Sequence, residues 1–183
     1  MVSKKQSLLL IVLGVLLLIA IIATLYIVIA RQNAVSEETK NIFAGVEDRI
    51  TYTDVNGAEL TLENFLGQVL VVTSWASWSP FTAADLTSLN LIAKDYPDDE
   101  VTFMAINRKE TKDQAARLLS TLPEFPELMI IIDTEDHFYH SVAGYAMPET
   151  IVFNKKGDIV LHQRGALTAV EVRQAIDQAL KAD

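Results

Sequence analysis

The stretch from Val69 to Leu86 constrains the fold of this chain more than any other. It opens with Val69–Val72, four apolar residues in a row, which favours a strand covered on both faces. Ser79 offers a side-chain oxygen as a helix N-cap, and Pro80 suits the first helical position because it lacks the N–H that would be unpaired there. The spacing therefore predicts a buried strand, a tight turn, and a helix that begins at Ser79 and ends before Pro97.

Strand-like and helix-like segments alternate through the rest of the folded part. Strands are expected over residues 101–106, 128–133 and 158–163, the last entered through a turn at 154–157. Helices are expected over residues 61–66, 111–122, 135–142 and from 168 onwards, the second and the last of which begin with capping boxes. A hairpin is expected over residues 49–60, where Asn56-Gly57 favours a type I′ turn.

The N-terminal part predicts a membrane anchor. Residues 1–7 are polar, and residues 8–30 carry no charge, so about 23 residues would form roughly 35 Å of helix, enough to span a bilayer. A cleaved signal peptide is the alternative, although the apolar run is longer than the about 7–15 residues usual there. Lys4 and Lys5 precede the span, which predicts a cytoplasmic N-terminus. Residues 31–46 are expected to form a tether, and residues 47–183 a folded domain outside the cytoplasm.

Charge and the absence of cysteine exclude several functions. The formal net charge is −9, which argues against nucleic-acid binding. The sequence contains no cysteine, so this chain alone cannot perform dithiol exchange or bind a metal through thiolates. His137 and His140 have a spacing that could place both on one helix face. No third ligand is evident beyond Asp133 and Asp136, so two solvated histidines are the favoured interpretation, and we expect neither a metal nor a cofactor.

Two motifs resemble the TlpA/ResA-like branch of the thioredoxin superfamily, over roughly residues 47–182. In that family Trp-Ala-Ser-Trp precedes Cys-Pro-Pro-Cys, and here Trp75–Trp78 match while Ser79 and Thr82 replace the two cysteines. The Met147-Pro148 pair resembles the family's cis-proline loop. The resemblance implies a thioredoxin-like α/β fold, with a central mixed sheet flanked by helices, and a cis bond before Pro148. It gives no catalytic residue, because the two cysteine positions are degenerate.

The resemblance also implies a binding groove beside the degenerate turn. Trp78, Phe81, Met147 and Pro148 are the candidate peptide-binding residues, whereas Trp75 is expected in the core. The predicted function is a redox-inactive polypeptide-binding, chaperone-like or assembly module. It would be a single-pass protein of a bacterial cell membrane whose partner is an extracytoplasmic polypeptide or a membrane complex.

Three alternatives remain open. One is a family-type oxidoreductase role in cytochrome maturation or envelope protein folding that depends on the thiols of a partner. The second is a purely structural subunit of a membrane complex. The third, a hydrolase that uses Ser79, lacks support because no histidine lies near it in sequence.

Overall fold

A computed structural model describes residues 50–166 and 168–182, together with residues 14, 17, 19, 21–24 and 26. Contacts divide the chain into two units, Met1–Lys40 and Asn41–Asp183. Most of the expected span 8–30 and the whole of the expected tether 31–46 lie outside the described residues. Among the residues that are described, no helix is long and apolar enough to cross a membrane.

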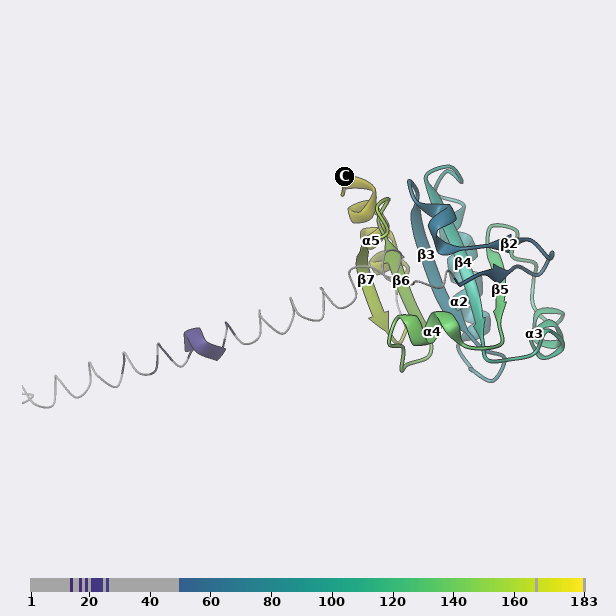
Figure 1. Ribbon diagram of the computed structural model, residues 1–183, viewed down its shortest axis with the longest axis horizontal. Helices are drawn as coiled ribbons and strands as arrows, with labels where there is room; N and C mark the ends of the chain where they lie inside the picture. The colour runs from purple at the N-terminus through teal and green to yellow at the C-terminus, as the bar shows by residue number, and fades with distance from the viewer. Residues whose placement is uncertain are drawn as a thin grey trace, which may run out of the picture. The chain divides into compact units, whose positions relative to one another are not determined.

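The second unit is built on a mixed sheet in the order β5-β4-β3-β6-β7 (Figure 1). Its strands are β3 (Val69–Trp75), β4 (Val101–Arg108), β5 (Met129–Asp133), β6 (Glu149–Phe153) and β7 (Ile159–Arg164). Strand β4 is parallel to both β3 and β5, whereas β6 is antiparallel to both β3 and β7. The expected α/β architecture with a central mixed sheet is confirmed.

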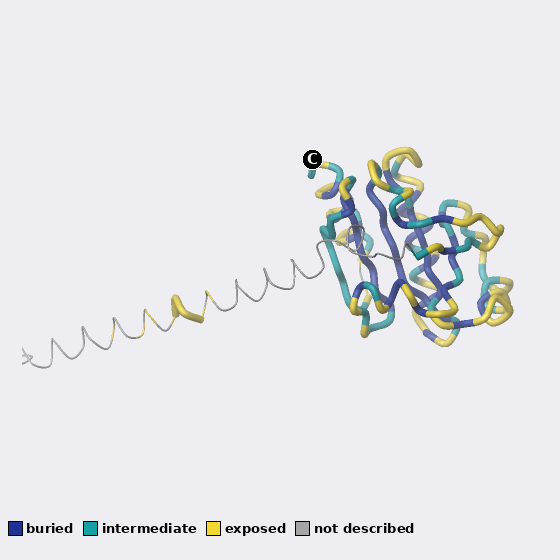
Figure 2. The backbone as a smooth tube through the Cα atoms, in the orientation of Figure 1, coloured by how far each residue is buried: buried dark blue, intermediate teal, exposed yellow. Residues whose placement is uncertain are grey.

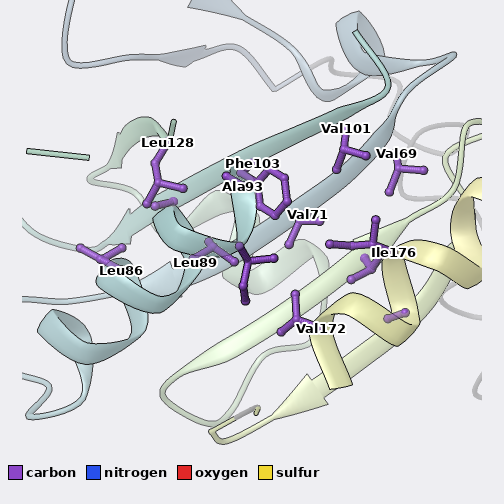
Figure 3. Close-up of a cluster of buried hydrophobic side chains, with 14 of the residues drawn as sticks. Val69, Val71, Leu86, Leu89, Ala93, Val101, Phe103, Leu128, Val172 and Ile176 are labelled. Atoms are coloured by element: carbon purple, nitrogen blue, oxygen red, sulfur yellow. The ribbon is translucent and has the colours of Figure 1, made fainter. Parts of the chain in front are cut away.

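Helices α2 (Thr82–Ala93) and α5 (Ala169–Lys181) cover one face of this sheet (Figure 1). Their apolar side chains pack on those of β3 and β4 (Figure 3). The opposite face is covered by the hairpin β1 (Tyr52–Thr53) and β2 (Glu59–Leu60), the 3-10 helix η1 (Leu62–Phe65) and α4 (His137–Ser141). Helix α3 (Lys112–Leu119) lies beside β5 and contributes Ala115 to the core. The domain therefore has three layers.

Strand β3 is buried along its whole length, as its apolar composition predicts (Figure 2). Side chains alternate between the two faces of a strand. Accordingly, Val69 and Val71 belong to the cluster under α2 and α5, whereas Leu70 and Val72 belong to the cluster under the hairpin and α4. Trp75 ends the strand in the first cluster with 1% of its surface exposed, so its predicted place in the core is confirmed.

The predicted start of the helix after β3 is wrong. Helix α2 begins at Thr82, its N-cap is Phe81, and no side chain caps it. Ser79 lies one turn earlier, and its N–H donates to the carbonyl of Ala76 at 3.1 Å. Pro80 and Phe81 form a further turn between Ser79 and the helix. Ser79 therefore belongs to the preceding loop and is not the N-cap of α2. The helix also ends at Ala93, before the predicted boundary.

The turn of the first hairpin differs from the prediction as well. Type I′ geometry requires positive φ at both central residues, but here Gly57 alone has positive φ (90°) and Asn56 does not. The turn runs from Asp54 to Ala58, and the Asp54 carboxylate accepts hydrogen bonds from the N–H groups of Asn56 and Ala58, each at 2.8 Å. A side chain therefore sets this turn. By contrast, both predicted capping boxes are present, at Thr111 and Thr168.

Candidate functional site

Two loops meet at one end of the sheet. Residues 76–81, here called the turn loop, follow β3, and residues 142–148, here called the proline loop, precede β6. Because β3 and β6 are antiparallel with Ser74 opposite Glu149, the two loops leave the sheet side by side. The sheet register therefore brings together two motifs that are about 70 residues apart in the sequence.

The two degenerate positions lie in the turn loop and at the start of α2, and both are buried. Ser79 is 7% exposed and Thr82 is 3% exposed. The Thr82 hydroxyl donates to the carbonyl of Ala76 at 2.7 Å, and the Ser79 hydroxyl accepts a long bond of 3.4 Å from the N–H of Phe81. Neither hydroxyl contacts a histidine or a carboxylate in the described part of the chain. A serine or threonine nucleophile needs such a base, so these two hydroxyls serve the backbone of the turn.

The turn loop is hydrogen-bonded to a buried carboxylate, Glu110, which the sequence analysis did not identify. Glu110 is 6% exposed and accepts hydrogen bonds from both the N–H (2.8 Å) and the hydroxyl of Ser77. The Asn107 amide donates to the same carboxylate at 2.7 Å. Glu110 is 33 positions from Ser77, and no local pattern signals the contact. Three hydrogen bonds compensate the burial of this charge.

The turn loop presents aromatic side chains to solvent. Trp78 is 63% exposed and Phe81 is 52% exposed. In the proline loop, Met147 is half-buried and Pro148 is buried, and the bond between them is cis, the geometry that the resemblance implied. Tyr145, which sequence reasoning missed, is 76% exposed in the same loop. The predicted binding residues thus lie on two adjacent loops, with the two aromatic rings outermost.

The proline loop is held by groups from α4 and β7. The Tyr139 hydroxyl donates to the carbonyl of Ala146 at 2.9 Å. Glu149, the residue after Pro148, is 1% exposed and contacts His162 at 2.5 Å and Arg164 at 3.3 Å. The Arg164 guanidinium also stacks on the Tyr145 ring, 4.6 Å from its centre. These contacts fix the second half of the loop and the residue that follows it.

A small cavity lies between α2 and the proline loop. Its lining includes Asp85, Thr73, Thr150 and Pro148. The Thr73 and Thr150 hydroxyls are 3.1 Å apart and hydrogen-bonded, whereas Oδ2 of Asp85 has no hydrogen-bond partner within the described residues. Burial raises the pKa of Asp85, because desolvation penalises the charged carboxylate.

The two histidines considered as metal ligands do not form a site. His137 and His140 are both exposed on α4. Within residues 50–166 and 168–182, no group of three or more His, Asp or Glu side chains is arranged to hold a metal ion. Asp133 and Asp136 are buried instead: Asp133 accepts from the N–H of Phe138, and Asp136 pairs with Arg108 at 2.6 Å. Both carboxylates are therefore committed to structural contacts.

The mixed sheet, the helices on its two faces and the cis-proline loop beside the turn that opens α2 define a thioredoxin-like domain. The chain belongs to the Redoxin family, whose profile matches residues 26–179, and is a TlpA/ResA-like member that lacks both active-site cysteines.

Curated relatives and solved structures agree with this assignment. The chain is 23% identical over 175 residues to "Thiol-disulfide oxidoreductase ResA" of Geobacillus thermodenitrificans, covering 95% of this chain and 97% of that protein. It is 29% identical over 105 residues to "Thiol:disulfide interchange protein DsbE" of Allochromatium vinosum, covering 57% and 55%. The crystal structure of a putative DsbE from Chlorobium tepidum superposes with a TM-score of 0.65 at 20% identity, covering 73% and 94%.

Proposed function

We propose that this protein is a redox-inactive thioredoxin-like module that binds polypeptide, anchored in the cell membrane with its folded domain outside the cytoplasm. It acts as a chaperone-like or assembly factor. The observation that carries the proposal is a contrast within one site. The thiols are absent from the whole sequence, yet Trp78 and Phe81 remain exposed beside the proline loop.

The chemistry of the degenerate positions supports redox inactivity. In disulfide exchange a thiolate attacks a disulfide sulfur, and a second thiol resolves the mixed disulfide. The relatives are named for that reaction. Here Ser79 and Thr82 have buried hydroxyls bonded to backbone groups, and a hydroxyl stays protonated near neutral pH. The protein would therefore bind a polypeptide without changing its redox state.

The backbone of the proline loop supports peptide binding. Neither the N–H nor the carbonyl of Met147 forms a hydrogen bond in the part of the chain that the structure describes. The adjoining carbonyl groups are occupied, because Ala146 accepts from Tyr139 and Pro148 accepts from the N–H of Gly165 at 2.8 Å. An extended peptide laid along the loop would pair with Met147, and main-chain pairing of this kind supplies affinity without sequence specificity.

The membrane anchor rests on the sequence. Residues 8–30 are uncharged and long enough to span a bilayer, and Lys4 and Lys5 precede them while Arg31 follows. This charge pattern supports a cytoplasmic N-terminus and an extracytoplasmic domain. An anchored binding module would act on chains that emerge near the outer surface of the membrane.

Site-specific photo-crosslinking in the native membrane tests the binding proposal. A photoreactive residue at Met147 should capture a polypeptide partner, whereas the same residue at Gln178, which is exposed on α5, should not. Equal capture at both positions, or none at either, would contradict a ligand site at the proline loop.

A reductase assay tests the absence of redox activity. The full chain, supplied with a dithiol donor, should reduce a disulfide-linked test protein no faster than the donor alone. A double substitution, Ser79→Cys with Thr82→Cys, provides the positive control because it restores the family's cysteine positions. Turnover by the unsubstituted chain above the donor background would refute the proposal.

A further inference from the structure

The two loops of the site carry no charged side chains. The turn loop with the first three residues of α2 (76–84) and the proline loop (142–148) contain no Asp, Glu, Lys, Arg or His, although Asp, Glu, Lys and Arg make up 21% of the chain and the net charge is −9. Acidic residues flank both segments, since Asp85 and Glu149 follow them directly, but Glu149 is buried and Asp85 is half-buried. The two segments themselves are therefore uncharged in an otherwise acidic protein.

Exposed aromatic rings are concentrated on the same two loops. Within residues 50–166 and 168–182, the aromatic side chains that are more than half exposed are Trp78, Phe81 and Tyr145. The other aromatic residues of this range are buried or partly buried. Exposed aromatic side chains that gather at one place on a surface are typical of a binding site, because tyrosine and tryptophan bury large areas at low entropic cost.

Tyr145 is held in place although most of its ring is exposed. The Arg164 guanidinium lies 4.6 Å from the centre of one ring face. The carboxylate of Glu149 lies 3.3 Å from Nε of Arg164 and offsets its charge, while 30% of the arginine side chain is exposed. The outer face of Tyr145 stays open. Immobilisation before binding reduces the entropy that the ring loses when it contacts a ligand.

We infer that this surface binds an extended, uncharged polypeptide segment whose alternate side chains are aromatic or long and apolar, and that Tyr145 contacts this segment. The inference rests on the proposed function and narrows it to one class of ligand. The segment is extended because the N–H and the carbonyl of Met147 are both unpaired among the described residues and can pair with one peptide backbone. Its apolar side chains alternate because successive residues of an extended chain point to opposite sides.

The absence of charge on the loops sets the specificity. A charged side chain seated on Trp78 or Phe81 would lose water without gaining an opposite charge from either loop, and an unpaired charge is costly to desolvate. The net charge of the protein further disfavours acidic segments. A lysine could gain a cation–π contact with Trp78, so basic segments are the critical comparison.

Peptide binding to the full-length chain tests the ligand class. Three peptides of one length would be compared: one that alternates phenylalanine with serine, and two copies with a single central glutamate or lysine. The two tryptophans, buried Trp75 and exposed Trp78, allow binding to be followed by fluorescence and by protection from a soluble quencher. We expect the uncharged peptide to bind, and each charged copy to bind about tenfold more weakly.

Substitutions test the part assigned to Tyr145. Tyr145→Ser should weaken binding of the uncharged peptide about tenfold, whereas Tyr145→Phe should bind like the parent because it keeps the ring. Leu66→Ser is the matched control, since Leu66 is 50% exposed just before β3, at the end of the sheet opposite to both loops. Loss of binding in Leu66→Ser, or unchanged binding in Tyr145→Ser, would overturn this part of the inference.

The outcomes separate the inference from the proposed function. Equal binding of all three peptides, with Trp78 protected, would overturn the ligand class and leave polypeptide binding intact. Failure of every peptide to bind or to protect Trp78 would overturn both. Weaker binding of both charged copies together with a loss in Tyr145→Ser would support the inference.

Discussion

The turn loop and the proline loop lie side by side but are held by different forces. The turn loop is fixed by hydrogen bonds between neutral donors and a few acceptors, chiefly Thr82 to Ala76 and Ser77 to Glu110. The proline loop is fixed by close packing and by ion pairs around Glu149. The turn loop is joined to the segment after β4 through Glu110, whereas the proline loop is joined to α4 and β7. Each loop thus depends on a buried carboxylate, which hydrogen bonds from neutral donors compensate at Glu110 and an ion pair with Arg164 compensates at Glu149.

The largest expected effect is on the buried charge of the proline loop. Glu149→Gln removes the charge that compensates Arg164 and weakens the contact with His162, and breaking this largely buried pair should lower the free energy of unfolding by about 3 kcal/mol. Denaturant unfolding measures the change. The exposed pair of Arg173 with Asp95 is the control, because Arg173→Gln should cost less than about 1 kcal/mol. Equal losses would contradict the distinction between buried and exposed pairs.

Packing of the proline loop is tested at Gly144. A Cβ at this position would lie 2.6 Å from ring atoms of Tyr139 and 2.8 Å from Glu149 Oε2. Gly144→Ala should therefore lower the free energy of unfolding by about 2 kcal/mol through overpacking. Adding Tyr139→Leu removes the obstructing ring, so the double variant should lose less than the sum of the single losses. Strict additivity in denaturant unfolding would refute the steric explanation.

The turn loop should respond more weakly, and first through Glu110. Glu110→Gln keeps the side-chain volume but places an amide nitrogen opposite one of the Ser77 donors. This change should lower the free energy of unfolding by about 1–2 kcal/mol. Because Ser77 precedes Trp78, the exposure of Trp78 to a soluble quencher should change as well. Glu100→Gln, at an exposed turn position, should leave both properties unchanged. A stability loss without a change at Trp78 would place the effect outside the turn loop.

The bond from Thr82 to Ala76 gives a smaller effect. Thr82→Val removes one buried hydrogen bond and should lower the free energy of unfolding by about 1 kcal/mol, while Thr82→Ser should retain most of it. Thr87 is the matched control, because its hydroxyl also donates to a carbonyl at 2.7 Å but is exposed on the same helix. Thr87→Val should cost less than Thr82→Val in thermal unfolding; the reverse order would contradict a role for the buried bond.

Asp85 gives the smallest expected change in the free energy of unfolding. Unlike the substitutions above, its replacement should stabilise the protein. Burial raises the pKa of Asp85 in the folded protein, so its contribution to stability is fully present below the unfolded pKa of about 3.9 and falls as pH rises through the folded pKa. Asp85→Asn should therefore stabilise the protein near neutral pH, by less than about 1 kcal/mol because the group is half-exposed. Thermal unfolding at neutral and acid pH measures this gain, and a gain that persists in acid would contradict the cause.

Much of the fold was predictable because the relevant signals are local. The apolar runs gave β3, β4 and β5, and the capping boxes at Thr111 and Thr168 gave the starts of α3 and α5. The place of Trp75 in the core followed from its position at the end of a buried strand. The site was predictable in part: the two loops came from motifs, but Tyr145 and Glu110 were missed, because their roles depend on Arg164 and Ser77, which are distant in sequence.

The sequence by itself determined that this chain contains no thiol and that its strands and helices alternate, because composition and side-chain period need no tertiary context. Tertiary structure decided where the helix after β3 starts: the hydrogen bonds of Ser79 and Thr82 to Ala76 displaced the cap that Ser79 offered locally. It also decided which charges are buried, since Glu149 meets His162 and Arg164 only when β6 pairs with β7. Contacts of this kind depend on the register between strands, which no local pattern encodes.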